Sequence, residues 1–154
     1  FARKPVEALA YGMDTLARCF HNVPEHVTTA VHMCCGYPNK LDATDYPKAD
    51  PHSYIQIATS VDGITDQISI EDAHRHNSED LFSLFEKSQL VIGFVKIASS
   101  QVESVEEIHA RMAEILRILP AERVIAAPDC GLGFLSRELA MTKLSNMSTA
   151  AKSV

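Results

Sequence analysis

The chain has 154 residues, of which 46% are hydrophobic and 22% charged, the balance of a globular domain with a single core. Its formal net charge of −6 argues against a nucleic-acid partner, because such proteins usually present a basic face. No apolar run approaches the roughly 20 residues that a membrane span needs. No signal peptide is visible and cysteines are few, which favours a reducing, cytoplasmic setting over a disulfide framework.

Helical and strand patterns alternate along the chain. In order, the patterns predict a helix over residues 5–20, a strand over 27–31, a long polar loop over 36–51, a helix over 51–62, a strand over 67–70, a helix over 78–87, a strand over 90–95, a helix over 104–119, a strand over 124–127 and a helix over 135–151. Strands alternating with amphipathic helices indicate an α/β fold with a parallel sheet and right-handed crossovers.

Chemically active side chains fall at or just after the carboxyl ends of the predicted strands. They are His32, Cys34, Glu71, Lys96 and Cys130. Parallel α/β folds bind ligands at that edge of the sheet, and (β/α)8 barrels build their active sites there. Four separate strands therefore direct chemistry to one rim.

His32, Cys34 and Cys130 suggest a metal. Thiolate and imidazole ligands in a tetrahedral arrangement suit Zn²⁺. For either His32 or Cys34 alone, burial in the core is the better interpretation, but the set on strand ends favours a metal site. We expect Cys35 to be a core or supporting residue and Cys19 to lie in a helix core.

Four strand–helix units are half of an eight-stranded barrel and cannot close alone. Either the sheet is open, or the chain is the later half of a (β/α)8 TIM barrel. Because the sequence begins at Phe1 rather than Met, we favour the second interpretation, with residues 1–154 as the C-terminal part of one domain.

Three motifs carry a family resemblance: 31–34 (Val-His-Met-Cys), 69–71 (Ser-Ile-Glu) and 128–132 (Pro-Asp-Cys-Gly-Leu). With the last helix around 143–147, they resemble the catalytic barrel of cobalamin-independent methionine synthase, from about His32 to the end of the chain. That resemblance implies a TIM barrel and zinc ligands at His32, Cys34, Glu71 and Cys130. It also implies methyl transfer from 5-methyltetrahydrofolate to the zinc-bound thiol of homocysteine.

The chain departs from that family at Ala98, which stands where the family carries a histidine that helps to protonate the departing folate nitrogen. Segments 34–38, 71–77 and 98–100 look closer to a short branch that includes epoxyalkane:coenzyme M transferase. The folate chemistry is therefore less secure than the activation of a thiol.

Further candidates surround the predicted metal. His74 or His76 is a candidate catalytic acid replacing the missing histidine, or part of a polar rim loop. Asp129 is a candidate catalytic residue that either accepts an N–H from His32 or binds a substrate amine. Arg75 and Lys96 either bind an anionic group of the substrate or pair with Asp72 and Glu71.

We therefore predict a zinc-dependent methyl or alkyl transferase that acts on a small thiol, with no nucleic-acid or membrane partner. The coenzyme M type of thiol addition to an epoxide is the alternative within the same chemistry. A non-catalytic half-barrel, stabilised by zinc and completing a partner chain, is the alternative of another class. A zinc-free barrel of the uroporphyrinogen decarboxylase type would leave His32, Cys34 and Cys130 unexplained.

Overall fold

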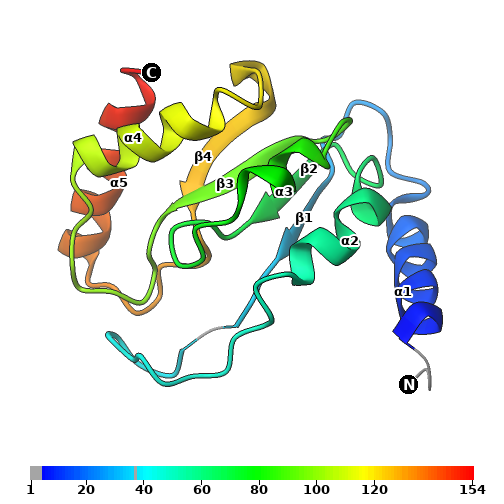
Figure 1. Cartoon of the computed structure of the whole chain (residues 1–154), viewed down its shortest axis with the longest axis horizontal. Helices are drawn as coiled ribbons and strands as arrows, with labels where there is room; N and C mark the ends of the chain where they lie inside the picture. The colour runs from blue at the N-terminus through cyan, green and yellow to red at the C-terminus, as the bar shows by residue number, and fades with distance from the viewer. Residues whose placement is uncertain (1–4, 37) are drawn as a thin grey trace.

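The computed structural model describes residues 5–36 and 38–154. Its centre is a four-stranded parallel sheet in the order β1-β2-β3-β4, formed by β1 (Ala30–Met33), β2 (Gln67–Ile70), β3 (Gln89–Val95) and β4 (Val124–Pro128). Sequential parallel order with right-handed crossovers places the connecting helices on the same side of the sheet. The predicted α/β fold with four strand–helix units is confirmed (Figure 1).

The helices are α1 (Pro5–Phe20), α2 (Ser53–Val61), α3 (Glu79–Ser83), α4 (Val105–Ile115) and α5 (Arg137–Ala151). Helices α4 and α5 lie side by side over β3 and β4, whereas α1 stands beside α2 near β1 (Figure 1). None of the helices in the described part of the chain is both long and apolar enough to cross a bilayer.

The core lies between the sheet and these helices. Alternate residues of β2 and β3 point into it, including Ile68, Ile70, Leu90 and Ile92, each 0% exposed. The opposite face carries His32, Ser69 and Val91 and is exposed or half-buried. One face of the sheet therefore holds the fold together, and the other remains accessible.

Three predicted elements differ from the structure, and one of them is α4, which ends at Ile115 rather than at 119. The first strand is Ala30–Met33 rather than 27–31, so His32 lies within the strand. Helix α3 ends at Ser83 rather than near Lys87, because the Asp62 carboxylate accepts the N–H groups of residues 86–88 and draws the chain into a turn. Cys19 is exposed on α1, contrary to prediction, whereas Cys35 is buried as expected.

Candidate metal centre

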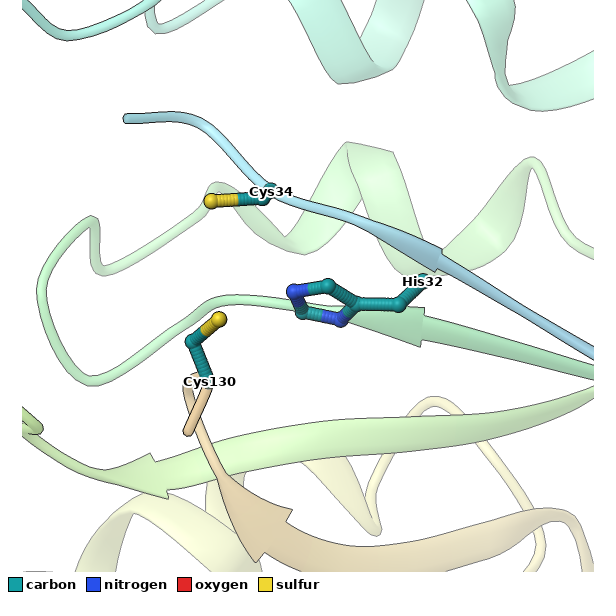
Figure 2. A group of neighbouring side chains, drawn as sticks. All are labelled: His32, Cys34 and Cys130. Carbon is teal, nitrogen blue, oxygen red and sulfur yellow. The ribbon is translucent and has the colours of Figure 1, made fainter. Parts of the chain in front are cut away.

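Strand β1 and the end of β4 bring three potential ligands together. His32 and Cys34 are alternate residues on β1 and its continuation, so they share one face of the sheet. Cys130 follows β4 after Pro128 and Asp129. One ring nitrogen of His32 and the Sγ atoms of Cys34 and Cys130 all lie within 4.8 Å of one another, and Figure 2 shows the His32 ring reaching toward both sulfurs.

Two sulfurs and one imidazole are a donor set that fits Zn²⁺. All four cysteines of the chain are free, so both thiols are available as ligands. An open hollow of about 230 Å³ borders His32, Ser69 and Cys130. The group therefore has the chemistry of a metal site and open space beside it.

Ser69 on β2 orients the His32 ring. Its Oγ lies 2.8 Å from Nδ1 of His32. A ring that donates its Nδ1 hydrogen to Ser69 presents Nε2 as the metal-binding nitrogen. Asp129 does not have the place that the sequence suggested beside His32, since its carboxylate is directed to residues 72–74.

Burial of the sulfur, together with the neighbouring Glu71 and Cys130, raises the pKa of the Cys34 thiol to about 11, and burial is the largest cause. A negative charge on either neighbour disfavours a thiolate at Cys34. At neutral pH the metal-free thiol is therefore protonated. A bound divalent cation reverses this preference, because a coordinating thiol loses its proton.

Glu71 follows β2 and is buried, with 4% of its surface exposed. Its Oε1 accepts a hydrogen bond from the backbone N–H of Cys35 at 3.3 Å, so the carboxylate lies beside Cys34. Within residues 5–36 and 38–154, the group whose ligand atoms lie within 4.8 Å contains only His32, Cys34 and Cys130. Glu71 as the fourth ligand stays a prediction.

The two rim histidines face different surroundings. Nδ1 of His74 lies 2.7 Å from Oδ2 of Asp129, and the His74 side chain is 13% exposed. His76 is exposed, has a left-handed backbone with φ of 52°, and borders a separate cavity of about 190 Å³ beside α4. The structure thus connects His74, rather than His76, to the segment that carries Cys130.

Arg75 and Lys96 lie outside the group of candidate metal ligands formed by His32, Cys34 and Cys130, which we call the metal group. Arg75 donates to the backbone carbonyls of Ala49 and Asp50, at 3.3 and 2.8 Å, and stacks over the Tyr54 ring. Lys96 borders the cavity beside α4. The predicted alternative of an ion pair between Asp72 and Arg75 or Lys96 is wrong, because the Asp72 carboxylate pairs with Arg111, with Nε and Oδ2 2.7 Å apart. Binding of a substrate anion by Arg75 or Lys96 stays a prediction.

Sequence reasoning missed the supporting residues Ser69, Tyr54 and Arg111. The Tyr54 hydroxyl donates to the Met33 carbonyl and accepts from the Glu71 N–H, so it joins the ends of β1 and β2. Arg111 gave a usable signal, because it is a charged residue beside the apolar stripe of α4, and such a residue usually has a partner. Ser69 belongs to the motif 69–71, which did not indicate its contact with His32, and Tyr54 gave no signal.

Ala98 is covered by the chain's own loop. The N–H of Asp42 donates to the Ala98 carbonyl at 2.8 Å, and the Asp42 carboxylate accepts from the Ser100 N–H at 2.7 Å. Figure 1 shows the loop that follows β1 extending beyond the carboxyl edge of the sheet toward the loop after β3. Asp42, in the loop after β1, therefore holds the segment that contains Ala98.

A parallel α/β sheet with imidazole and thiol groups gathered at its carboxyl edge defines the class of protein, an α/β domain with a candidate metal site at that edge. Residues 22–153 match the family model described as "Cobalamin-independent synthase, Catalytic domain". The chain belongs to this family.

Known relatives agree with that placement. The chain is 36% identical over 89 residues to a methionine synthase of Pyrococcus furiosus, covering 57% of this chain and 26% of that protein. It is 26% identical over 143 residues to the methionine synthase of Sulfolobus acidocaldarius, covering 92% of this chain and 37% of that one. A 5-methyltetrahydropteroyltriglutamate–homocysteine methyltransferase of Thermotoga petrophila is 39% identical over 92 residues, covering 56% of this chain and 12% of the relative.

The fold has a solved counterpart. The structure of a B12-independent methionine synthase from Shewanella sp. W3-18-1, in complex with selenomethionine, superposes with a TM-score of 0.81 at 24% identity. The match covers 95% of this chain and 43% of that one. The chain therefore has the fold of the C-terminal half of a TIM barrel, and it spans less than half the length of these relatives.

Proposed function

We propose that this chain supplies the metal-binding part of a zinc-dependent transferase that moves a methyl or other alkyl group to a small thiol. The observation that carries the proposal is the convergence of His32, Cys34 and Cys130 within 4.8 Å at the carboxyl edge of the sheet. Membership of the cobalamin-independent synthase family supports it. A reducing compartment, the cytoplasm, suits a site built from free thiols.

His32, Cys34 and Cys130 would hold the zinc ion, and Glu71 would be the fourth ligand. When bound, zinc keeps a substrate thiol in its nucleophilic thiolate form near neutral pH, where a free thiol, with a pKa of about 8.5, is mostly protonated. Glu71 is the weakest competitor of an incoming sulfur, so we expect its carboxylate to yield when the thiol binds. Its bond to the Cys35 N–H would keep the carboxylate near the site.

The transfer needs a proton donor for the leaving group. The substrate sulfur forms a bond to the alkyl carbon while the bond from that carbon to nitrogen or oxygen breaks, and the leaving atom takes up a proton. His74 is our candidate donor, because Asp129 fixes its ring at 2.7 Å beside the Cys130 segment. Since a carboxylate can only accept, Nδ1 of His74 carries the hydrogen toward Asp129, and Nε2 is the atom that exchanges a proton with a substrate.

The identity of the alkyl donor distinguishes two activities. The relatives' names specify a methyltetrahydropteroyl donor and homocysteine, which is the first candidate pair. Ala98, at the place where the family carries a histidine that helps to protonate the folate nitrogen, favours the second candidate, addition of a thiol such as coenzyme M to an epoxide. Either activity requires the remaining strands of the barrel, from a longer form of the chain or from a partner chain.

A thiol titration of the metal-loaded protein tests the proposal. Zinc-edge absorption spectra recorded with homocysteine or coenzyme M should show one added sulfur and one fewer oxygen neighbour. A sulfur count that stays constant with both thiols would refute thiol activation and favour the non-catalytic zinc-stabilised half-barrel. Transfer assays with methylfolate and with a small epoxide then identify the donor.

A further inference from the structure

Asp129 connects two segments that carry proposed metal ligands. It immediately precedes Cys130, and its carboxylate binds the turn that begins directly after Glu71. We propose that Asp129 is a positioning residue that holds the Cys130 and Glu71 segments in register and thereby sets the affinity of the site for metal. The inference rests on the metal site of the proposed function and assigns a role to a side chain outside the ligand set.

Four donors converge on this one carboxylate. Oδ1 accepts the backbone N–H groups of Asp72 and Ala73, both at 2.9 Å. Oδ2 accepts the backbone N–H and the ring Nδ1–H of His74, both at 2.7 Å. The Asp129 side chain is 0% exposed, so water does not compete for these bonds. A buried carboxylate is tolerated only when its oxygens are paired in this way, and charge-assisted bonds are the stronger kind.

Strand β3 lies between the Cys130 segment and the turn after Glu71, and it leaves room for the Asp129 side chain to reach that turn. Gly93 is its residue beneath Asp129, and a Cβ atom built there would stand 2.0 Å from Oδ1 and 2.6 Å from Cα of Asp129. Real Cβ atoms do not approach other atoms so closely, so any side chain at residue 93 displaces Asp129. The glycine at residue 93 of β3 thus makes the contact between the β4 end and the turn after β2 possible.

Backbone hydrogen bonds add to the connection that the Asp129 carboxylate makes with residues 72–74. The Asp129 N–H donates to the Val95 carbonyl at 3.0 Å, and the Ala73 N–H also lies 2.9 Å from the Gly93 carbonyl. Asp129 is therefore fixed to β3 by its main chain and to the turn by its side chain. Movement of the turn is transmitted to the residue next to Cys130, and the reverse also holds.

Asp72 provides a matched control, because it is an equally buried aspartate, at 1% exposed, on the same turn. Its carboxylate binds Arg111 on α4 and the N–H of Asn77. It therefore stabilises the helix-covered side of the turn without reaching the Cys130 segment. Comparing variants of the two aspartates therefore separates the general effect of losing a buried carboxylate from the loss of the connection between Asp129 and the turn.

Zinc affinity of the intact protein, measured by competition with a chromophoric chelator, tests the inference. In Asp129→Asn the amide nitrogen faces the two His74 donors, so two of the four hydrogen bonds to this side chain are lost. We expect zinc binding to weaken about 10- to 100-fold, the range seen when partners of metal ligands are removed. Gly93→Ala should weaken it in the same direction with the carboxylate retained, and Asp72→Asn should leave it within about twofold of wild type. Gly93→Ala decides the question if Asp129→Asn does not fold.

Hydrogen exchange provides the second readout. The amides of residues 72–74 should exchange faster in Asp129→Asn while amides of the core strands stay protected. Zinc affinity unchanged in both Asp129→Asn and Gly93→Ala would overturn the inference, as would an equal loss in Asp72→Asn. Cys34→Ala distinguishes failure of this inference from failure of the proposed function. If Cys34→Ala also binds zinc like wild type, the proposed metal site itself is wrong.

Discussion

The two faces of the sheet divide the work of the molecule. The helix-covered face buries Ile68, Ile92 and their neighbours completely, and its polar groups are tied in ion pairs such as Arg111–Asp72. The other face carries the exposed His32 and Cys34 and the half-buried Cys130. Substitutions on the first face should therefore cost folding free energy, and substitutions on the second should cost metal binding.

The largest effect is expected for Cys130→Ala. With one sulfur of the three-residue group removed, the protein should not retain zinc through gel filtration, as measured by elemental analysis. Because Cys130 is only half-buried, the free energy of unfolding of the metal-free protein should change little. Cys19→Ala, at an exposed position on α1, is the control and should retain zinc. Full zinc retention in Cys130→Ala would contradict the division between the two faces.

Phe82→Ala should have the opposite profile. Phe82 on α3 is 0% exposed, and truncation of such a core aromatic costs about 3–5 kcal/mol. Urea unfolding of the metal-free protein measures this loss. Zinc affinity of the folded fraction should stay near wild type. Tyr11→Ala, at a side chain 74% exposed on α1, is the matched aromatic control and should unfold like wild type.

Ser104→Ala should have a smaller effect on the same face. Ser104 caps α4 by accepting the Glu107 N–H, while the Glu107 side chain accepts the Ser104 N–H. Loss of such a cap costs about 1 kcal/mol. The midpoint of urea unfolding should fall, and Ser104→Asp, which keeps an acceptor at the cap, should restore most of it.

The smallest effect is a pH dependence on the accessible face. The Cys34 thiol has a folded pKa of about 11 against an ordinary value of 9.0, so the unfolded chain loses this proton first as the pH rises. The group contributes nothing below the lower value, and it lowers the stability of the metal-free protein as the pH rises between the two. Solvent screens this exposed group. The difference between the unfolding free energies at about pH 8 and about pH 10 should therefore be smaller in Cys34→Ser than in wild type. An equal difference in the two proteins would contradict this prediction.

Local patterns predicted the fold and part of the site. The range 5–20 for α1 and the range 67–70 for β2 agree with the structure, because each has a periodic apolar pattern with clear ends. The meeting of His32, Cys34 and Cys130 followed from parallel strands whose carboxyl ends share one edge. These inferences need only the repeat of the strand and the order of the elements.

Contacts between distant turns were outside the reach of such patterns. Asp129 bonds to residues more than fifty positions away, and nothing in the sequence shows that Gly93 leaves room for it. The early end of α3 has the same origin, since Asp62 captures the following N–H groups from another loop. Side-chain bonds of this kind depend on the packed arrangement rather than on local preference.

The exposure of His32 and Cys34 has a consequence for the medium around the metal group. In a closed barrel the inner face is packed with side chains, and closing this one would remove water from the three ligands. A lower dielectric strengthens the attraction between a divalent cation and thiolates, and it disfavours an uncompensated thiolate still more. If the group binds zinc as proposed, zinc binding and enclosure of the barrel would be thermodynamically linked, and each should strengthen the other.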